Sequence, residues 1–527
     1  MYGVSVALFG LSLVLFLRFY WIRKESMKIF KLINVPGPPP NFLFGNLISF
    51  AKKQAFYSTY LDWYKIYGKT FGYFEGLRPV LVTADLDILN QVMVKKFDVF
   101  HARKVFPVQV DPDKDDEVHM FFARGDRWKR LRAISNPAFT SAKIRKMSSL
   151  VHNCIDNVIA ELKRRAHNND SIEMYDIFQR LTLDSMSSCG FGFKTSAIQN
   201  PNDIFLKNCR QVLYNTTRPS LFFLIGFLFP NTDKFLVRLA RLRDYIFGNP
   251  VFWLEKQFEK IIAMRKKFDS VPRMDLLHMM IEANKLTHSE ESLHVHETPS
   301  QNIPEPKYKY AKLSLLELRS QCFLFLMAGY ETTATTLIYT AYELAYNQEI
   351  QSKLYDEIIE CFPNKDDEIT YDIVNKMEYL DKVWCETLRK YPLASTVVAR
   401  QAETSCKLSE DLTIPKGMIV QANIWAIHYN PDVWGADPHK FNPERFLPEL
   451  VAHRHPMAYL AFGAGPRKCI GIQFAKMEGK IAIVKLVQTF HMILSEKQGP
   501  LETIEGATIA PVNGVYLRLY PRDIDQE

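Results

Sequence analysis

Apolar positions recur at helical spacing over most of this chain. The period of about 3.6 residues predicts helices at residues 141–165, 176–189, 235–265 and 314–347. Two other segments are rich in aromatic and β-branched residues and contain turn residues. They predict strands at 71–83 and at 396–424, the second with a turn at 415–417. The fold class predicted from this pattern is mainly α with small β-sheets.

The first apolar stretch is long enough to cross a membrane. Residues 2–22 carry one charge, Arg18, and as a helix they would extend about 30 Å, the thickness of a bilayer core. Basic residues follow this stretch and none precedes it, so the positive-inside rule places the rest of the chain in the cytosol. A cleaved signal peptide would instead begin with basic residues and end at a small-residue cleavage site. We therefore expect one N-terminal transmembrane helix that stays attached.

A proline-rich joint follows this helix at residues 35–40. Successive prolines remove backbone donors and favour a stiff, extended conformation. No other segment is typical of a linker, so we expect a membrane anchor with a basic linker at 1–35 and one domain at 36–527. The polar stretch 284–312 is expected to be a solvated loop, with metal binding as the alternative because it contains three histidines. These are His288, His294 and His296.

A second apolar run, at residues 221–229, is too short to span a bilayer. It could belong to the core of the domain, or it could dip into the surface of a membrane. The sequence leaves both alternatives open.

Composition excludes several classes of protein. The net charge of +8 is diffuse, which does not indicate a nucleic-acid partner but suits an anionic membrane surface or an acidic protein. The eight cysteines form no CxxC pair and no zinc-type spacing. Scattered single cysteines are typical of reduced thiols that face the cytosol.

One of these cysteines lies in an unusual context. The segment Phe462–Gly471 reads FGAGPRKCIG, so two glycines and a proline precede Cys469 in a tight loop. Missing side chains allow the backbone to approach a planar ligand closely. A helical run at 472–490 follows the loop, and a cysteine near a helix N-terminus favours the thiolate form.

The spacing FxxGxRxCxG resembles the haem-binding loop of the cytochrome P-450 family. Further segments resemble motifs of that family in the family's order. They are the helix WKRLR at 128–132, the distal motif AGYETT at 328–333, the ExxR pair at 386–389 and the PERF segment at 441–446. The resemblance covers roughly residues 36–520. Within the microsomal members, the chain looks closest to the clan that includes steroid- and drug-oxidising enzymes and thromboxane synthase.

The resemblance implies the cytochrome P-450 fold, haem b as cofactor and Cys469 as its axial thiolate ligand. It implies that Thr332 donates a hydrogen bond to dioxygen and that Glu331 helps to relay protons. The two haem propionates need buried cationic or hydrogen-bonding partners. The candidates for that role are Trp128, Arg132, Arg400 and Arg467, while Phe462 is expected to pack beside the sulfur.

Two features of the motifs have more than one explanation. Gly329 costs about 1 kcal/mol relative to alanine inside a helix, which a gap for dioxygen or close packing against a neighbouring helix would explain.

Glu386 and Arg389 lie on one helical face and could form a weak surface pair. By resemblance they are buried together with Arg445, in which case backbone carbonyls must share the surplus arginine donors.

The implied function is a monooxygenase that oxidises a lipophilic small molecule, such as a steroid, fatty acid or xenobiotic. The family implies NADPH–cytochrome P-450 reductase as electron donor, a cytochrome b-type protein as a second donor, and the endoplasmic reticulum membrane as location. The alternatives are a peroxide isomerase of the thromboxane-synthase type, which needs no reductase, and a non-catalytic haem sensor. The expected pocket lining is largely apolar and includes Phe106, Phe121, Phe325 and Val397.

Overall fold

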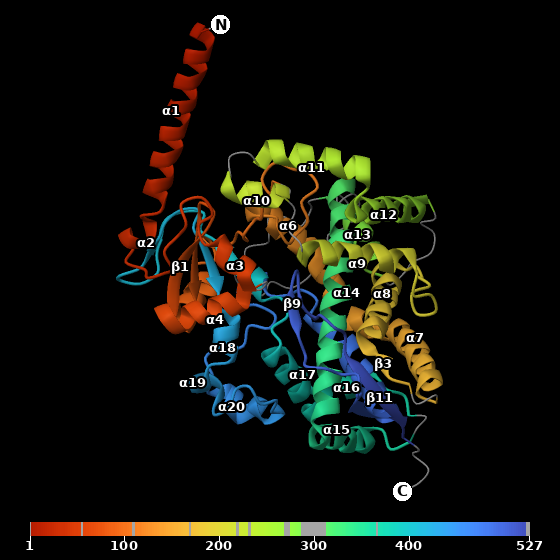
Figure 1. Cartoon of the computed structure of the whole chain (residues 1–527). Helices are drawn as coiled ribbons and strands as arrows, with labels where there is room; N and C mark the ends of the chain where they lie inside the picture. Colours follow the sequence, from red (N-terminus) through yellow and green to blue (C-terminus); the bar gives the residue numbers. More distant parts are fainter. Residues whose placement is uncertain are drawn as a thin grey trace, which may run out of the picture.

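A single long helix, α14 (Leu315–Tyr346), crosses the body of the protein (Figure 1). The structure is a computed structural model, and it describes residues 2–53, 56–107, 111–167, 170–217, 221–229, 233–267, 275–285, 312–364 and 367–522. A capping box starts α14, as the sequence predicts. The Glu317 N–H donates to the Ser314 hydroxyl at 3.0 Å, and the Ser314 N–H donates to the Glu317 carboxylate at 3.1 Å.

Several helices pack on α14, and four of them do so most extensively. They are α8 (Met174–Phe191), α12 (Pro250–Lys267), α17 (Glu378–Lys390) and α21 (Ile472–Thr489). Nearly all side chains of α8 are buried, because it lies between α14 and α7 (Ser141–Ala166). This layer of helices forms the larger hydrophobic core of the protein.

The other helices surround this core. They are α2 (Ile29–Leu32), α3 (Leu47–Lys53), α4 (Phe56–Tyr67), α5 (Leu86–Asn90), α6 (Gly125–Ser135), α9 (Ile204–Thr217), α10 (Leu221–Leu228), α11 (Asp233–Phe247), α13 (Leu276–Lys285), α15 (Gln348–Cys361), α16 (Tyr371–Lys376), α18 (Ile424–His428), α19 (Pro431–Trp434) and α20 (Pro448–Ala452). Shorter 3-10 and π turns are η1 (Gln91–Lys95), η2 (Asn136–Phe139), η5 (Ser395–Val397), η6 (Pro443–Phe446) and η7 (Gly465–Arg467).

The sheets are small, and the largest has four strands in the order β1-β2-β7-β4. It pairs the hairpin predicted at 71–83 with the second predicted strand region, through the parallel contact between β2 and β7. A three-stranded sheet has the order β3-β11-β8, and two hairpins complete the β structure. The strands are β1 (Thr70–Glu75), β2 (Arg78–Thr83), β3 (Ile172–Glu173), β4 (Ala399–Gln401), β5 (Cys406–Lys407), β6 (Thr413–Ile414), β7 (Ile419–Ala422), β8 (Phe490–Leu494), β9 (Thr503–Glu505), β10 (Ile509–Pro511) and β11 (Tyr516–Pro521).

The fold class predicted from the sequence is confirmed, and one predicted helix is wrong in its extent. The segment 235–265 forms two helices, α11 and α12, and not one. Gly248 has φ of 76°, which ends α11, and Pro250 begins α12. The helical period continues across this corner because each helix buries apolar residues at helical spacing, so the pattern alone conceals the break.

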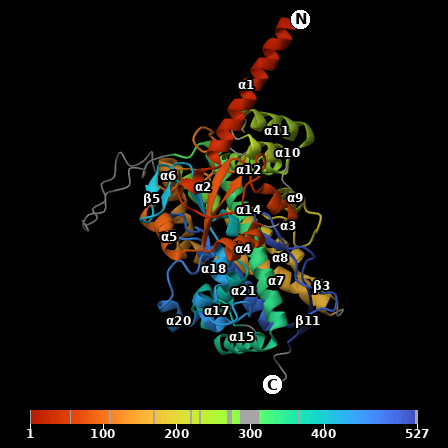
Figure 2. The same ribbon diagram turned by 60° about the vertical axis from the view of Figure 1, so that its left-hand side comes forward.

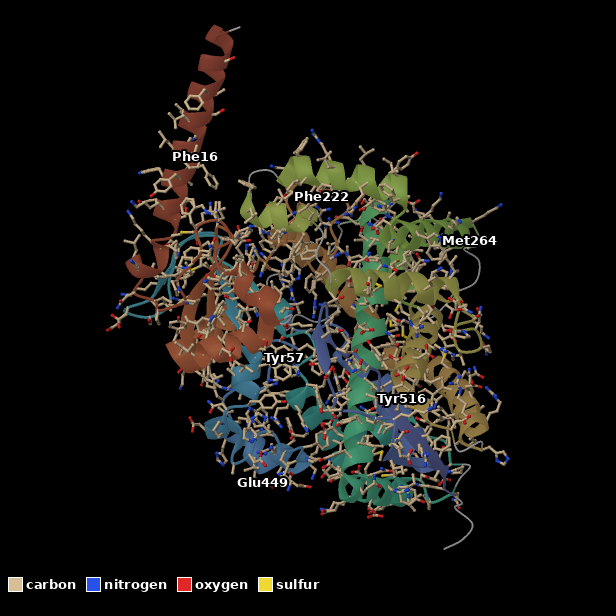
Figure 3. The ribbon with its side chains drawn as sticks, in the orientation of Figure 1. Phe16, Tyr57, Phe222, Met264, Glu449 and Tyr516 are labelled. Carbon is tan, nitrogen blue, oxygen red and sulfur yellow. The ribbon has the colours of Figure 1, made fainter. Side chains whose placement is uncertain are left out.

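The N-terminal helix α1 (Tyr2–Ser26) projects from the body beside α10 and α11 (Figures 1 and 2). Phe16 lies on its free part, well clear of the domain (Figure 3). Within the described part of the chain, no helix has the length and apolar character that a membrane crossing requires. The three histidines at 288, 294 and 296 lie outside the described residues, so the predicted loop stays a prediction.

The base of α1 is attached to the domain. Arg23 is buried and donates to the backbone oxygens of Phe42 and Leu43. The rings of Phe19 and Phe229 lie 5.8 Å apart, which brings α1 against the end of α10. Phe30 in α2 is buried on β1, with its ring 5.0 Å from that of Phe74. The segment that joins α1 to the domain is therefore part of the packed structure.

Candidate active site

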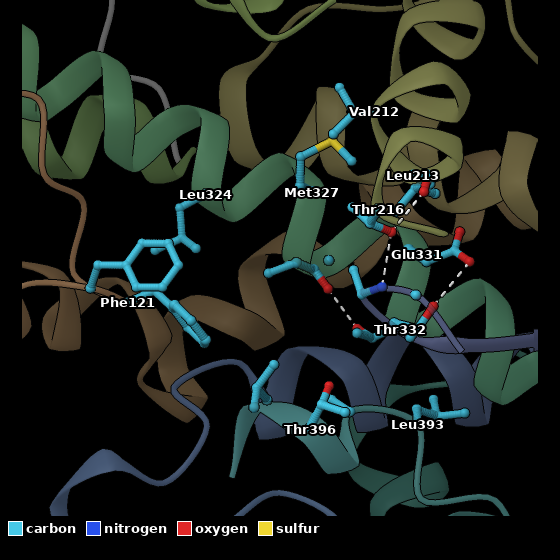
Figure 4. A pocket seen from close by; sticks show the side chains of 18 of the residues that line it. Phe121, Val212, Leu213, Thr216, Leu324, Met327, Glu331, Thr332, Leu393 and Thr396 are labelled. Atoms are coloured by element: carbon cyan, nitrogen blue, oxygen red, sulfur yellow. Dashed lines mark hydrogen bonds between the residues drawn. The ribbon is translucent and has the colours of Figure 1, made fainter. Parts of the chain in front are cut away.

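A cavity of about 1840 Å³ lies beside the middle of α14 (Figure 4). Ordinary ligand pockets measure about 300–1,000 Å³, so this space is large enough for a cofactor together with a substrate. The four apolar residues predicted to line the pocket all line it: Phe106, Phe121, Phe325 and Val397. The predicted site residues Trp128, Arg132, Glu331, Thr332, Arg400, Phe462, Arg467 and Cys469 line the same cavity.

The Cys469 loop has the tight geometry that its glycines predict. Gly463 and Gly465 have φ of 68° and 67°, a conformation that side chains disfavour. A Cβ atom on Gly465 would lie 2.0 Å from the backbone oxygen of Met93, so the loop packs closely on η1. The Cys469 N–H donates to the Phe462 oxygen at 3.0 Å, which closes the loop just before α21.

Cys469 is accessible although it lies deep in the protein, because its side chain opens into the cavity. Burial raises the pKa of its thiol. The backbone N–H of Gly471 and the guanidinium groups of Arg132 and Arg103 oppose this rise, because each favours the thiolate. The sulfur thus has both an open face and groups that stabilise its anionic form.

Arginines gather around this side of the cavity without a matching carboxylate. Arg103, Arg132, Arg400 and Arg467 all line it, and none pairs with an acidic side chain within the described ranges. Burial lowers the pKa of Arg400 strongly, and Arg103 adds repulsion. The Nε atoms of Arg103 and Arg400 are buried and have no hydrogen-bond partner among the described residues. Such a cluster requires an anionic partner, because unpaired buried donors are costly.

The four arginines differ in how far their donors are already used. Arg467 donates to the backbone oxygens of His101, Met120, Phe121 and Ala123 at 2.5–3.3 Å, and its guanidinium lies 4.4 Å from the centre of the Trp128 ring. Its contacts join the Cys469 loop to the segment 101–123. Arg400 has one such bond, to the Ala399 oxygen at 2.9 Å. Arg103 donates to the backbone oxygens of Val397 at 2.7 Å and Arg467 at 3.3 Å, whereas the Arg132 side chain has no hydrogen bond to the described residues. Free donors therefore remain mainly on Arg400 and on Arg132.

These features fit haem b. Its two propionates would supply the anionic partner that the arginines lack, and its planar ring would lie over the small-residue loop at Cys469. Arg103 belongs to this set, although the sequence analysis does not identify it. No local motif marks it: its position beside Cys469 and Arg132 results from long-range packing.

Glu386 and its arginines form the fully buried cluster that the resemblance implies, not a surface pair. Arg389 donates twice to the Glu386 carboxylate, at 2.6 and 2.8 Å, and both side chains have no exposed surface. Arg445 approaches the same carboxylate at 3.6 Å. The surplus donors go to backbone oxygens, as the charge argument requires: those of His428, Trp434, Ala436 and Asp437.

His428 connects this cluster to the Cys469 loop. Its Nε2 accepts the Leu460 N–H at 3.0 Å, so its Nδ1 carries the proton and donates to the Arg389 oxygen at 3.0 Å. Burial lowers the pKa of His428 to about 3, which keeps the ring neutral. Sequence analysis does not identify this residue, because nothing local distinguishes it from any other histidine.

The middle of α14 forms one wall of the cavity. Thr332, Thr335 and Thr336 each donate to the carbonyl four residues earlier, at 2.5–2.7 Å, as expected for threonines in a helix. At Gly329, a Cβ atom would lie 2.4 Å from the Met186 sulfur of α8. Close packing against a neighbouring helix is therefore sufficient to explain this glycine.

Glu331 is buried beside Thr332, on the side of the cavity opposite Phe121 (Figure 4). Its carboxylate accepts from Tyr175 and from Gln179, Thr335 and Thr508, the last three at 3.2–3.3 Å. Burial raises its pKa, while these donors lower it. The pair predicted from the sequence is therefore next to the cavity, and the acid is held from behind by several neutral donors.

Comparison with known proteins agrees with this geometry. The family model "Cytochrome P450" matches residues 35–517. Cytochrome P450 3A11 of Mus musculus is 33% identical over 523 residues, which cover 98% of this chain and 96% of the relative. Cytochrome P450 3A5 of Homo sapiens is 33% identical, with the same coverage. Putative cytochrome P450 CYP13A8 of Caenorhabditis elegans is 33% identical over 88% of this chain and 90% of the relative. The chain therefore belongs to the cytochrome P450 family, and it is a monooxygenase that uses haem b with a cysteine thiolate as axial ligand.

Proposed function

We propose that this enzyme inserts one oxygen atom of dioxygen into a lipophilic small molecule, such as a steroid, a fatty acid or a xenobiotic. The second oxygen atom leaves as water, and NADPH supplies the two electrons. The observation that carries this proposal is one cavity lined by Cys469, by a cationic cluster and by a largely apolar surface that includes many aromatic side chains. A lipophilic substrate fits that surface, because aromatic side chains provide large apolar contacts.

We assign the cofactor contacts residue by residue. Cys469 would bind the haem iron through its thiolate, and Phe462 would shield the sulfur from water. Trp128, Arg132 and Arg400, together with Arg103, would hold the propionates, and Arg467 would add its charge while it holds the loop in place. When bound, the haem supplies the chemistry of oxygen activation, which a thiolate ligand promotes by donating electron density.

The chain's own catalytic groups are Thr332 and Glu331. Thr332 lines the cavity, and its hydroxyl would donate a hydrogen bond to dioxygen by turning away from the Ala328 oxygen to which it donates. Glu331 passes protons toward that position, because reduction of one oxygen atom to water consumes two protons. Burial raises the pKa of Glu331, which favours its uptake of a proton.

The electrons come from a partner protein. The sequence contains no Rossmann fingerprint or flavin motif, so the chain cannot bind NADPH in that way. We propose NADPH–cytochrome P-450 reductase as the donor, with a cytochrome b-type protein as a second one.

We propose that the enzyme is anchored in the endoplasmic reticulum membrane through residues 1–35, with the domain 36–527 in the cytosol. The apolar sequence of residues 2–22 and the basic residues after it support this proposal. Exposed Leu221 and Phe229 on the same end of the molecule suit contact with lipid. Deletion of residues 1–22, which leaves Arg23 and Phe30 in place, should release the protein from membranes and leave its haem content unchanged.

Two measurements test the activity. Cys469→Ala should abolish the thiolate-type spectrum of the reduced carbon monoxide complex, whereas Cys385→Ala, at a cysteine in α17, should keep it. Product formation should require NADPH and the reductase. Product formed from a peroxide substrate without either would indicate an isomerase, and no turnover of any lipid, steroid or drug that shifts the haem spin state would indicate a sensor.

A further inference from the structure

The carboxylate of Glu331 is surrounded by neutral donors from three parts of the fold. Tyr175 and Gln179 belong to α8, Thr335 to α14 itself, and Thr508 to the turn between β9 and β10. No lysine, arginine or histidine pairs with Glu331 in the part of the chain that the structure describes. Glu331 is 3% exposed and also lines the cavity, so a proton that comes from the surface outside the cavity reaches it through one of these four groups.

One of the four donors is less buried than the other three. Thr335, Thr508 and Gln179 are buried, with exposed fractions of 0%, 8% and 7%. Tyr175 is half-buried, in the first turn of α8. Its hydroxyl donates to Glu331 in a short hydrogen bond. A hydroxyl can accept one proton while it donates another, which an amide cannot do at a useful rate.

The hydrogen bonds that reach Glu331 through Gln179 position the carboxylate and do not carry protons. Arg210 donates from Nε to the Gln179 oxygen at 2.8 Å, so the Gln179 amide must direct its Nε2 toward Glu331. Arg210 and Arg180 both pair with Asp176, which fixes the arginines on α8 and α9. This branch holds the second carboxylate oxygen in place, and it contains no group that can take up a proton at neutral pH.

We infer that Tyr175 is the outer station of a proton path that leads from the surface between α8 and the β9–β10 hairpin to Glu331, a role that rests on the proposed function of Glu331. The phenol oxygen receives a proton from water while the phenol hydrogen passes to the Glu331 carboxylate. Tyr175 is unchanged at the end, and Glu331 has gained one proton for the cavity.

The electrostatics of Tyr175 support a concerted transfer. Burial and the neighbouring Glu331 carboxylate raise its pKa well above the ordinary value, so a phenolate does not accumulate. Tyr175 acts through Glu331 and is therefore a positioning residue for proton delivery, without direct contact with the reacting atoms.

Tyr175→Phe tests the path, with Tyr339→Phe as the matched control. Tyr339 is a buried tyrosine within α14, and its hydroxyl donates to the Ile509 backbone oxygen at 2.9 Å. With NADPH and the reductase, Tyr175→Phe should lower product formation about threefold to tenfold, less than the ~100-fold effect of losing a direct acid or base. More hydrogen peroxide should be released, and the solvent deuterium isotope effect should increase. Tyr339→Phe should change none of these.

Turnover supported by hydrogen peroxide separates proton delivery from structure. Peroxide brings oxygen with its electrons and protons already attached, so Tyr175→Phe should leave this reaction at the wild-type rate. An equal loss of both reactions would show that Tyr175 only supports the fold. Unchanged NADPH-dependent turnover and isotope effect would exclude Tyr175 from the path.

An infrared titration gives a readout that does not depend on activity. The carboxyl band of Glu331 is the one that Glu331→Gln removes. Because the Tyr175 hydrogen bond lowers the pKa of Glu331, Tyr175→Phe should move the midpoint of that band to higher pH, and Tyr339→Phe should not. An unmoved midpoint would contradict the contact on which the inference depends. Absence of NADPH-dependent product in the wild type would overturn the proposed function, and the path with it.

Discussion

Two glutamates that are both buried on helices at the centre of this enzyme have different surroundings. Glu386 on α17 faces two arginines, one of which donates to it twice. Glu331 on α14 faces hydroxyl and amide groups only. Burial raises the pKa of both carboxyl groups, but at Glu386 the guanidinium of Arg389 opposes that rise.

The difference in hydrogen-bond donors indicates a structural role for Glu386 and a role in proton exchange for Glu331. A carboxylate in a bidentate pair with arginine is held in one geometry and in its ionised form. Glu386 can thus hold Arg389, and through His428 the backbone near Leu460, in a fixed position. A carboxylate with only neutral donors can gain and lose a proton without leaving an unpaired charge behind. Glu331 can therefore exchange protons, while Glu386 cannot do so without structural damage.

A third glutamate extends the series. Glu478 on α21 has no exposed surface, and neither carboxyl oxygen has a hydrogen-bond partner among the described residues. Burial raises its pKa to about 8, with the Ser185 hydroxyl nearby as a weak opposing influence. The surroundings thus decide the form of each side chain. Glu386, paired with arginines, is a fixed charge, and Glu331, among neutral donors, can exchange protons. Glu478, with almost no donor, is a neutral acid.

The largest effect is expected for a substitution at Glu386. Glu386→Ala leaves Arg389 and Arg445 buried and unpaired, which should cost about 3–5 kcal/mol. Little haem-loaded protein should be recovered, as measured by haem absorbance per milligram. The control is Glu349→Ala on α15, which removes the exposed pair with Lys353 at 2.9 Å and should leave the yield unchanged. A normal haem content in Glu386→Ala would remove the contrast between the two glutamates.

The next effect concerns stability against pH at Glu478. Its pKa is about 8 in the folded protein and 4.5 in the ordinary reference state, so between these values the folded state binds more protons. The stabilisation is complete below pH 4.5 and is lost as pH rises toward 8, by up to about 1.4 kcal/mol per pH unit. Glu478→Gln should flatten the fall of the thermal midpoint between pH 5 and 8. The exposed Glu496→Gln should not, and an equal slope in Glu478→Gln would show that the acid is ionised.

A smaller effect is expected at Glu331, and it tests the comparison directly. Glu331→Gln keeps the size of the side chain and should fold and bind haem normally, in contrast to Glu386→Ala. Product formed per NADPH oxidised should fall about tenfold, because an amide cannot pass a proton. The measurement compares haem content and product yield in the same preparation. Loss of haem would place Glu331 with Glu386 as a structural residue.

The smallest effect is expected at Thr332. Thr332→Ala removes one hydroxyl and one bond to the Ala328 oxygen, and it keeps helix propensity. NADPH and dioxygen should still be consumed, but several-fold more should emerge as hydrogen peroxide and less as oxygenated product. An unchanged ratio of product to NADPH would remove Thr332 from proton delivery and leave Thr333 as the next hydroxyl to test.

Much of the site could be predicted because its signals are local. Short-range sequence determines the glycine-rich turn before Cys469, the capping box at Ser314 and Glu317, and the helical spacing of Glu386 and Arg389. Each depends on residues within a few positions of one another, so backbone preferences and helical geometry suffice to predict it.

What the tertiary structure decided depends on contacts between distant segments. Arg103, Tyr175 and His428 have no local motif. Each acquires its role from a partner 32 to 364 residues away: the Arg467 oxygen, Glu331 and the Leu460 N–H. The break between α11 and α12 was also hidden, because both helices bury apolar faces with the same period. The amino-acid sequence by itself determined the family, the ligand loop and the helical frame. Only the tertiary packing decided that Glu386 meets charged donors and Glu331 meets neutral ones, because those donors include side chains that other segments bring to each carboxylate.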